Sequence, residues 1–283
     1  MEVFNGAAFV RLRCCARRGM YLAADKDGRS VCLSVKRGVH NTVWAVQPAE
    51  GPDGVPCVLL RGAYGRYLFA TYILKKIGPC NGVEVQQQGI YNLPLGRGFH
   101  WQAIRRGSSF VLRSATRRYL RAHGKYRRSR KMVTATEDTG STMMKWAIES
   151  VPVRMARPSI LDPTRQLTHS RDRPPTEGQV TRSIRYIRAG ADGSIAEDEA
   201  AWTTMQFRSS SLMQLRLTLA SRLGAAGRAD QTTLCIRGGP HGQLTPLLID
   251  LPIGKDPIDI VIFNHGTQAD NDLRYPDLDA RTK

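Results

Sequence analysis

The sequence predicts a mainly β protein in two parts, because its first half repeats one pattern three times and its second half combines strands with one helix. In each repeat an apolar alternation precedes a Tyr-Leu pair, a second alternation follows it, and a tryptophan closes the copy. The three sets are Tyr21-Leu22 with Trp44, Tyr67-Leu68 with Trp101, and Tyr119-Leu120 with Trp146. Alternation with a period of two is typical of strands, so four strands in each of three copies predict a β-trefoil. We expect the residues of these three sets to form its structural core.

The spacing of the repeated residues supports this architecture. In the three copies, the leucine of the first alternation and the tyrosine are 9, 7 and 7 residues apart, and the tyrosine and the tryptophan are 23, 34 and 27 apart. A short and nearly constant interval is typical of a hairpin, whereas a variable interval is typical of loop insertions. An ordinary β-sandwich with a coincidental tryptophan spacing is the alternative architecture.

The second half predicts an α+β, ubiquitin-like β-grasp domain. Strands around Ile184/Tyr186 and in Trp202–Phe207 precede the clearest helix of the chain, which begins after Ser211 and stops at Gly224. Three short strands are then expected around Leu234/Ile236, Leu247/Ile249 and Ile258–Ile262. One hairpin, one helix and further short strands follow each other in the order of a β-grasp.

We expect this second domain to dock onto another protein. Transfer in the manner of ubiquitin needs a terminal Gly-Gly pair, whereas this chain ends in Ala280–Lys283 and carries Gly238-Gly239 as an internal turn. The domain is therefore expected to be a docking or assembly module, with a protein partner that the sequence does not identify.

Charge and proline content divide the chain into four segments. Residues 1–151, the basic β-trefoil, carry 25 Lys and Arg against 9 Asp and Glu, whereas residues 183–283 carry 11 against 12. We assign 152–181 to a proline-containing linker, 182–265 to the β-grasp domain and 266–283 to a disordered acidic tail. Because the linker has no apolar periodicity, we expect few contacts across it and independent folding of the two domains.

The motifs that the sequence lacks argue against several classes of function. It has no Gly-x-Ser-x-Gly, His-Glu-x-x-His or Walker A motif, and its six histidines lack metal-ligand spacing, so we expect no enzyme, cofactor or metal. Thr42, Phe99 and Met144 stand two positions before the tryptophans, so the Gln-x-Trp motif of sugar-binding trefoils is missing. The six cysteines form no Cys-x-x-Cys pair, and no segment is typical of a secretory signal or a transmembrane helix. We expect a cytoplasmic protein with reduced thiols.

The strongest functional signal is a run of positive charge in the third repeat, which we call the basic cluster. Between Arg105 and Lys131 there are 11 Lys and Arg and no Asp or Glu. The residues expected to bind a polyanion are Arg113, Arg117, Arg118, Arg121, Lys125, Arg127, Arg128, Arg130 and Lys131. Strand alternation directs Arg113 and Arg121 away from the core, and a surface of one charge sign attracts polyanions. The segment Lys125–Lys131 also fits a nuclear-import signal, which makes the nucleus the alternative location.

Two sets of segments carry a resemblance to a known family. They are Met1–Asn5, Val10–Arg13 and Tyr21–Asp25 in the first half, and Ile184–Tyr186, Trp202–Phe207, Leu212–Arg216, Leu244–Leu247 and Leu251-Pro252 in the second. Through them the first half resembles the plant "domain of unknown function 569" (DUF569) proteins, and the second half resembles the module that often accompanies this domain. The resemblance implies a trefoil similar to the fascin-type, actin-crosslinking trefoils, although a shared fold does not by itself carry a function.

Charge and resemblance together give one leading hypothesis and two alternatives. The leading hypothesis is a non-enzymatic scaffold or cytoskeletal adaptor whose basic trefoil binds an acidic protein surface such as F-actin. The alternatives are the binding of nucleic acid and the binding of anionic lipid through the same basic cluster. Only Tyr119 and Tyr126 interleave with its arginines, and Tyr119 is expected in the core, so aromatic platforms for single strands are scarce.

Overall fold

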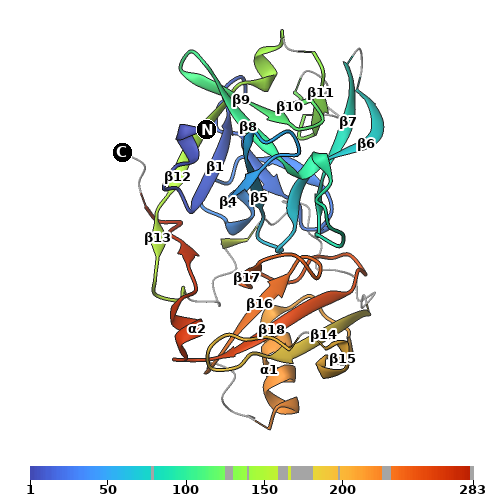
Figure 1. Cartoon of the computed structure of the whole chain (residues 1–283), viewed down its shortest axis with the longest axis vertical. Coiled ribbons are helices and arrows are strands. Elements are labelled where there is room, and N and C mark those ends of the chain that lie inside the picture. The colour runs from blue at the N-terminus through green and yellow to red at the C-terminus, as the bar shows by residue number, and fades with distance from the viewer. Residues whose placement is uncertain are drawn as a thin grey trace.

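The chain forms the two predicted domains, a β-trefoil and a β-grasp domain, which lie one above the other (Figure 1). The computed structural model describes residues 1–77, 80–124, 130–138, 140–158, 165–166, 181–196, 198–224 and 231–280. Within these ranges no helix is long and apolar enough to cross a membrane.

The trefoil contains four strands in each repeat, as the sequence predicts. The first repeat holds β1 (Phe9–Cys14), β2 (Tyr21–Ala24), β3 (Val31–Ser34) and β4 (Trp44–Glu50). The second holds β5 (Pro56–Arg61), β6 (Tyr67–Ile77), β7 (Cys80–Gln88) and β8 (Trp101–Arg106). The third holds β9 (Ser109–Ser114), β10 (Tyr119–Ala122), β11 (Val133–Thr136) and β12 (Trp146–Val151). All belong to one sheet, which closes because β1 pairs with β12.

A short 3-10 helix precedes the closing strand of every repeat, a regularity that the strand pattern does not reveal. These helices are His40–Thr42, Arg97–Phe99 and Thr142–Met144, and a further one is Glu2–Phe4 at the start of the chain. Each of the first three ends two positions before a core tryptophan. It therefore sets the direction from which the indole enters the core.

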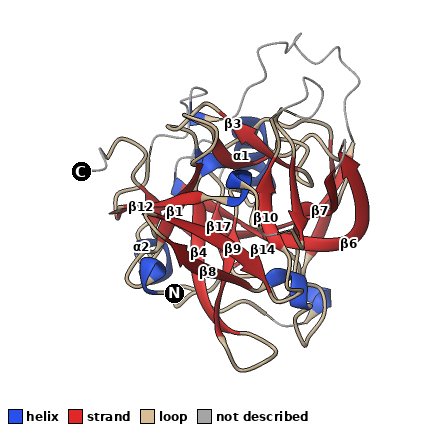
Figure 2. Ribbon diagram, turned by 90° about the horizontal axis from the view of Figure 1, so that it is seen from above, coloured by secondary structure: helices blue, strands red, loops and turns tan. Residues whose placement is uncertain are grey.

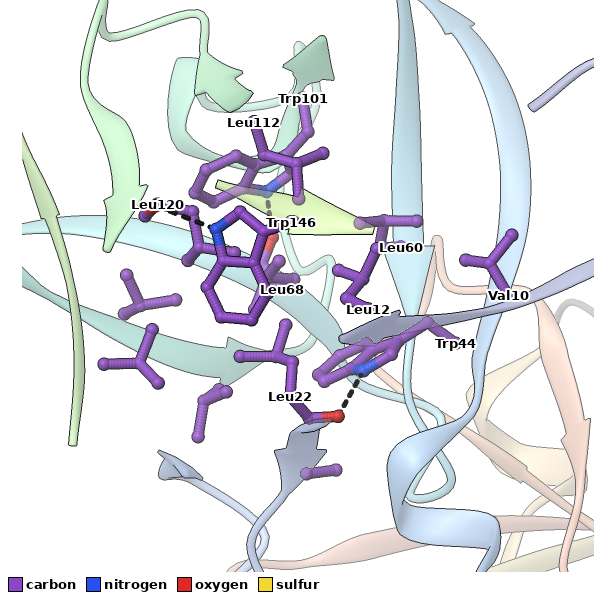
Figure 3. Packing of buried hydrophobic residues seen from close by; sticks show 14 of the residues in the cluster. Val10, Leu12, Leu22, Trp44, Leu60, Leu68, Trp101, Leu112, Leu120 and Trp146 are labelled. Carbon is purple, nitrogen blue, oxygen red and sulfur yellow. Dashed lines mark hydrogen bonds between the residues drawn. The ribbon is translucent and has the colours of Figure 1, made fainter. Parts of the chain in front are cut away.

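One hydrogen bond recurs in all three repeats and explains the repeated Tyr-Leu and Trp residues. The indole nitrogen Nε1 donates to a leucine carbonyl in each: Trp44 to Leu22 at 3.2 Å, Trp101 to Leu68 at 2.9 Å, and Trp146 to Leu120 at 3.0 Å (Figure 3). All six side chains are fully buried in one central cluster. A buried indole N–H needs an acceptor, and the neighbouring strand supplies one without bringing a polar side chain into the core.

The tyrosines of the Tyr-Leu pairs are less uniform than the sequence predicts. Tyr21 and Tyr67 are buried, whereas Tyr119 is only half-buried, which corrects its expected place in the core. Adjacent residues of a strand point to opposite faces, so the leucine enters the central cluster while the tyrosine lies outside it. Whether the tyrosine is buried then depends on what covers the outer face. Over Tyr67 the cover comes from Leu59, Ile90 and Phe99 of the trefoil. The second domain adds a contact, since the backbone N–H of Gln243 donates to the phenol oxygen at 3.0 Å.

The β-grasp domain is a five-stranded mixed sheet with the order β15-β14-β18-β16-β17. Its strands are β14 (Arg182–Arg188), β15 (Thr203–Phe207), β16 (Thr232–Arg237), β17 (Leu244–Pro246) and β18 (Ile258–Asn264). A short 3-10 helix, Glu199–Ala201, precedes β15, and the central pair β14 and β18 runs parallel. Helix α1 (Leu212–Arg222) contributes Leu212, Leu215 and Leu219 to the core, and the hydroxyl of Ser211 caps it by accepting the N–H of Gln214 at 3.3 Å.

The strand expected around Leu247 and Ile249 lies slightly earlier in the chain, as β17, and ends just before Leu247. Leu247 packs into the core of the β-grasp domain, but Ile249 belongs to the central cluster of the trefoil. Both residues are buried, as the alternation suggests, but each packs in the core of a different domain.

The two domains are docked through backbone contacts, which differs from the few contacts expected. The backbone N–H of Ile90, after β7, donates to the carbonyl of Gly238 at 2.7 Å. An ion pair joins Arg66 to Asp256 at 2.9 Å. Hydrogen bonds between the backbones of two domains fix their relative position more strictly than side-chain contacts do, because no rotamer change can absorb a shift.

The Gly238-Gly239 turn is the place where the two backbones come closest. A Cβ atom at 238 would lie 2.2 Å from the carbonyl oxygen of Gly65, and one at 239 would lie 2.4 Å from the carbonyl oxygen of Ile90. Both distances are too short for any real Cβ contact, so this docking requires glycine at both positions.

The segment expected to be a disordered tail is ordered as far as residue 280. It forms helix α2 (Gln268–Asn271) and strand β19 (Tyr275–Pro276), and β19 pairs with β13 (Val153–Arg154) from the expected linker. Tyr275 is fully buried, and Leu278 packs in a small cluster on the trefoil. These two apolar side chains anchor the segment despite its acidic composition, which is why composition alone gave the wrong expectation.

Candidate functional site

A cup of about 630 Å³ opens where the third strands of the three repeats meet. Strand β11 pairs with β7, and single bridges join Ser30 to Gln86 and Cys32 to Met132, so β3, β7 and β11 surround one depression. Its buried lining is mainly apolar: Val31, Leu33, Val85 and Val133 lie there beside the buried Ser34. The cup is therefore a place to which all three repeats contribute.

Each repeat supplies one lysine to this cup, namely Lys36, Lys75 and Lys131. Lys75 forms an ion pair with Glu84, and this hydrogen bond is the main reason that the pKa of Glu84 is lowered. Glu84 is therefore ionised at neutral pH and compensates Lys75. Asp25 is the other acid in the lining, so three lysines stand against two carboxylates and the cup carries a small positive excess.

Among its described residues, the basic cluster reaches the cup at its C-terminal end. Lys131 lines the cup, and Arg130 beside it is exposed. The guanidinium Nη1 of Arg17 donates to the carbonyl of Arg130 at 3.2 Å and to that of His123 at 3.0 Å, which holds this segment against the first repeat. Three predicted binding residues, Lys125, Arg127 and Arg128, lie outside the described residues.

Three other arginines of the basic cluster are paired with side chains of the trefoil. They are Arg113 with Gln102 at 2.8 Å, Arg118 with Glu137 at 3.1 Å, and Arg121 with Asp138 at 3.1 Å. Glu137 and Asp138 follow the acid-free stretch of the sequence almost immediately, so a count that stops at Lys131 misses them. The expectation of an uncompensated strip of positive charge is corrected here, because these two acids reduce its field.

Arg117 is exposed and lies apart from the cup, at a position where the other repeats have glycine. Its φ is +64°, close to the +70° of Gly19 and the +71° of Gly65, and all three residues stand two positions before the repeated tyrosine. A side chain in this left-handed region is strained, because the Cβ approaches the backbone. The third repeat thus tolerates a strained arginine in the turn that the other two make with glycine.

The titratable groups near the cup are poorly suited to catalysis. Burial lowers the pKa of His123 to about 4, so its ring is neutral at neutral pH and shares a hydrogen bond with the hydroxyl of Thr134 at 2.7 Å. Burial likewise raises the pKa of Cys32, which keeps its thiol protonated. In the part of the chain that the structure describes, no group of three His, Cys, Asp or Glu could hold a metal ion.

Sequence reasoning missed Lys36 and Lys75. The two residues occupy different places in their repeats, since Lys36 follows β3 whereas Lys75 lies within β6. Aligning the repeats does not bring them together, and neither belongs to a run of positive charge as long as the basic cluster. Only the way the strands of the three repeats meet places them with Lys131.

Comparison with known families and structures agrees with this architecture. A family model described as "Beta-trefoil domain of unknown function (DUF569)" matches residues 1–149, and one described as "DUF569 associated ubiquitin-like domain" matches residues 180–263. A search of curated proteins finds no match to the chain.

Several solved structures are similar to about half of the chain. A salivary protein from Culex quiquefasciatus of the Cysteine and Tryptophan-Rich family is 21% identical with a TM-score of 0.38, over 50% of this chain and 92% of that one. The designed threefold symmetric protein ThreeFoil is 16% identical with a TM-score of 0.40, over 50% and 97%. A Polyporus squamosus lectin, bound to an influenza-binding epitope, is 16% identical with a TM-score of 0.39, over 53% and 50%. Similarity of this degree carries no argument about function.

Proposed function

The chain belongs to the DUF569 β-trefoil family, and we propose that it is a non-enzymatic binding protein whose trefoil binds an acidic macromolecular surface at the lysine-bearing cup. The observation that carries this proposal is the meeting of one lysine from each repeat, Lys36, Lys75 and Lys131, at a single cup. The domain around it has a large excess of Lys and Arg over Asp and Glu, so the local charges lie in a positive long-range field.

The position of the cup within the molecule supports the same proposal. Strands β7 and β11, which form two of its sides, lie at the end of the trefoil away from the β-grasp sheet (Figure 1). A large acidic partner can therefore approach the cup from the side of these two strands. Arg130, exposed next to Lys131, enlarges the positive surface on the outer side.

Three kinds of acidic surface are compatible with these charges. F-actin is the acidic protein surface that the resemblance to fascin-type trefoils suggests. Nucleic acid has less support, because Tyr119 is half-buried and offers only part of its ring for stacking. Anionic lipid is the third kind, since clusters of lysine near a surface bind acidic headgroups.

The experiment is a charge reversal at the cup. In the full chain, Lys36→Glu, Arg130→Glu and Lys131→Glu should weaken binding to whichever acidic surface is the partner by about tenfold or more, because each reversed charge turns an attraction into a repulsion. Co-sedimentation with F-actin, binding to single-stranded RNA and flotation with acidic vesicles, each at two salt concentrations, would measure it.

A second triple variant provides the control for net charge. Arg188→Glu, Arg208→Glu and Lys255→Glu reverse three exposed cations of the β-grasp domain and change the net charge equally. Binding should be retained in this control. An equal loss in both variants would mean that only the total charge matters, and the cup would then not be the binding site.

A further inference from the structure

Strand β6 contains a bulge that exposes three consecutive apolar side chains. Ala70 pairs with Val85 and Leu74 pairs with Val83, so three residues of β6 stand opposite Glu84 alone. These three are Thr71, Tyr72 and Ile73. Tyr72, Ile73 and the following Leu74 are 67%, 57% and 82% exposed. A bulge of this kind bends the strand and redirects its side chains.

The bulge is held by specific hydrogen bonds and is not a loose loop. The hydroxyl of Thr71, which is buried, donates to the carbonyl of Glu84 at 3.0 Å and accepts the backbone N–H of Ile73 at 3.1 Å. The side chain of Glu84 is in turn paired with Lys75. The fold therefore maintains a conformation in which the apolar side chains face water.

Two lysines follow this apolar run in the strand, and the first of them lines the cup. Lys75 and Lys76 follow Leu74 directly, and Lys75 lines the cup together with Val35 and Lys36 of the first repeat. Val35 is itself 71% exposed. We call Val35, Tyr72, Ile73 and Leu74 the apolar rim: Val35 lines the cup, and the other three directly precede its lining residue Lys75 in the strand.

The apolar rim is unusual for the surface of a soluble domain. Single exposed apolar residues are common, but several adjacent ones next to cations mark an interaction surface. The hairpin of β6 and β7 lies at the edge of the trefoil in both views, so Tyr72, Ile73 and Leu74 are carried on a peripheral element (Figures 1 and 2). Exposed apolar side chains on a peripheral hairpin are suited to a partner with an apolar interior into which they can insert.

We propose that the apolar rim inserts into the interface of an anionic lipid bilayer while the lysines of the cup bind the lipid phosphates. This inference rests on the proposed function and names its partner class. Apolar side chains gain free energy by entering the boundary between headgroups and acyl chains, and tyrosine is favoured at that depth. The lysine stems lie along apolar surface while their ammonium groups stay among the headgroups. A nucleic acid backbone would use the cations but offers nothing to the apolar rim.

The first experiment replaces the three β6 residues of the apolar rim with polar ones and keeps every charge. Tyr72→Gln, Ile73→Gln and Leu74→Gln together should weaken binding of the full chain to phosphatidylcholine vesicles containing phosphatidylserine by about tenfold or more, and wild-type binding should depend on the phosphatidylserine. Met155→Gln, Met213→Gln and Leu217→Gln form the control, because these side chains are also exposed but lie elsewhere. The control should bind as the wild type does, and all variants should keep the wild-type melting temperature.

The second experiment detects insertion directly. In a Tyr72→Trp variant, bilayers with brominated acyl chains should quench the added fluorescence, whereas the native core tryptophans should be unaffected.

If the rim variant binds acidic vesicles as the wild type does, or Tyr72→Trp is not quenched, insertion is overturned. Should the charge-reversal variant alone lose binding, the proposed function stands without insertion. Binding to F-actin or RNA but to no vesicle overturns the lipid inference and keeps the proposed function, and binding to none of them overturns both.

Discussion

Replacing Gly238 with alanine tests the docking of the two domains with a single methyl group. The φ of Gly238 is not in the left-handed region, so alanine is compatible with its backbone and the cost is purely steric. The new Cβ would lie 2.2 Å from the carbonyl oxygen of Gly65, and ordinary contact requires the two backbones to separate by about 1 Å. That movement would break the hydrogen bond between Ile90 and Gly238, which is 2.7 Å long.

The expected loss of stability follows from these terms. Overpacking in a tight interface costs about 1–3 kcal/mol. One or two lost backbone hydrogen bonds cost about 1 kcal/mol each. We therefore expect Gly238→Ala to lower the free energy of unfolding of the full chain by about 2–5 kcal/mol.

Urea unfolding followed by tryptophan fluorescence measures this loss, because Trp44, Trp101 and Trp146 report on the trefoil while Trp202 lies in the other domain. The control is Gly38→Ala, since Gly38 has no positive φ and nothing lies within 4 Å of its added Cβ. This control should change stability by less than about 0.5 kcal/mol. Equal midpoints for the wild type and Gly238→Ala would refute the docking argued here.

Two further changes test the trefoil itself. Arg117→Gly should stabilise the protein by about 0.5–1 kcal/mol in the same urea assay, because it relieves a left-handed arginine at a position where Gly19 and Gly65 serve the other repeats; a destabilised variant would contradict this explanation. His40 and His123 have pKa values of about 4 when folded, against an ordinary value of 6.5, so the unfolded chain binds more protons between these values. Stability should therefore be fully present above pH 6.5 and should fall as the pH is lowered towards 4, and a flat melting temperature across this range would disprove it.

The sequence predicted most of the trefoil because its signals are local. A strand alternation, a Tyr-Leu pair and a tryptophan can each be recognised within a few residues, and they recur. Tyr119 shows the limit of this reasoning. The alternation shows on which side of the strand the tyrosine lies, but the extent of its burial depends on whether another part of the chain covers that side.

The cup and the domain interface could not be predicted, because both depend on residues distant in sequence. Lys36 and Lys75 reach Lys131 only after three repeats have closed around one axis. Arg121 looked uncompensated until Asp138 was found at its side. Gly238 was recognised as a turn, but the need for glycine there comes from a carbonyl in the other domain.

The pairing of β13 with β19 has a consequence for how the domains assemble. β13 directly follows the last trefoil strand, β12, and β19 follows the β-grasp domain. The β-grasp domain is thus joined to the trefoil at its N-terminal end by the chain itself and at its C-terminal end by the β13–β19 pairing. A domain held at both ends meets its docking site at a high effective concentration, because the two connections keep the domain close to that site. The same two domains, mixed as separate chains, would have to associate on the strength of the interface alone. Removal of β19 would therefore weaken the docking of the two domains at Ile90 and Gly238, although β19 does not contact either residue.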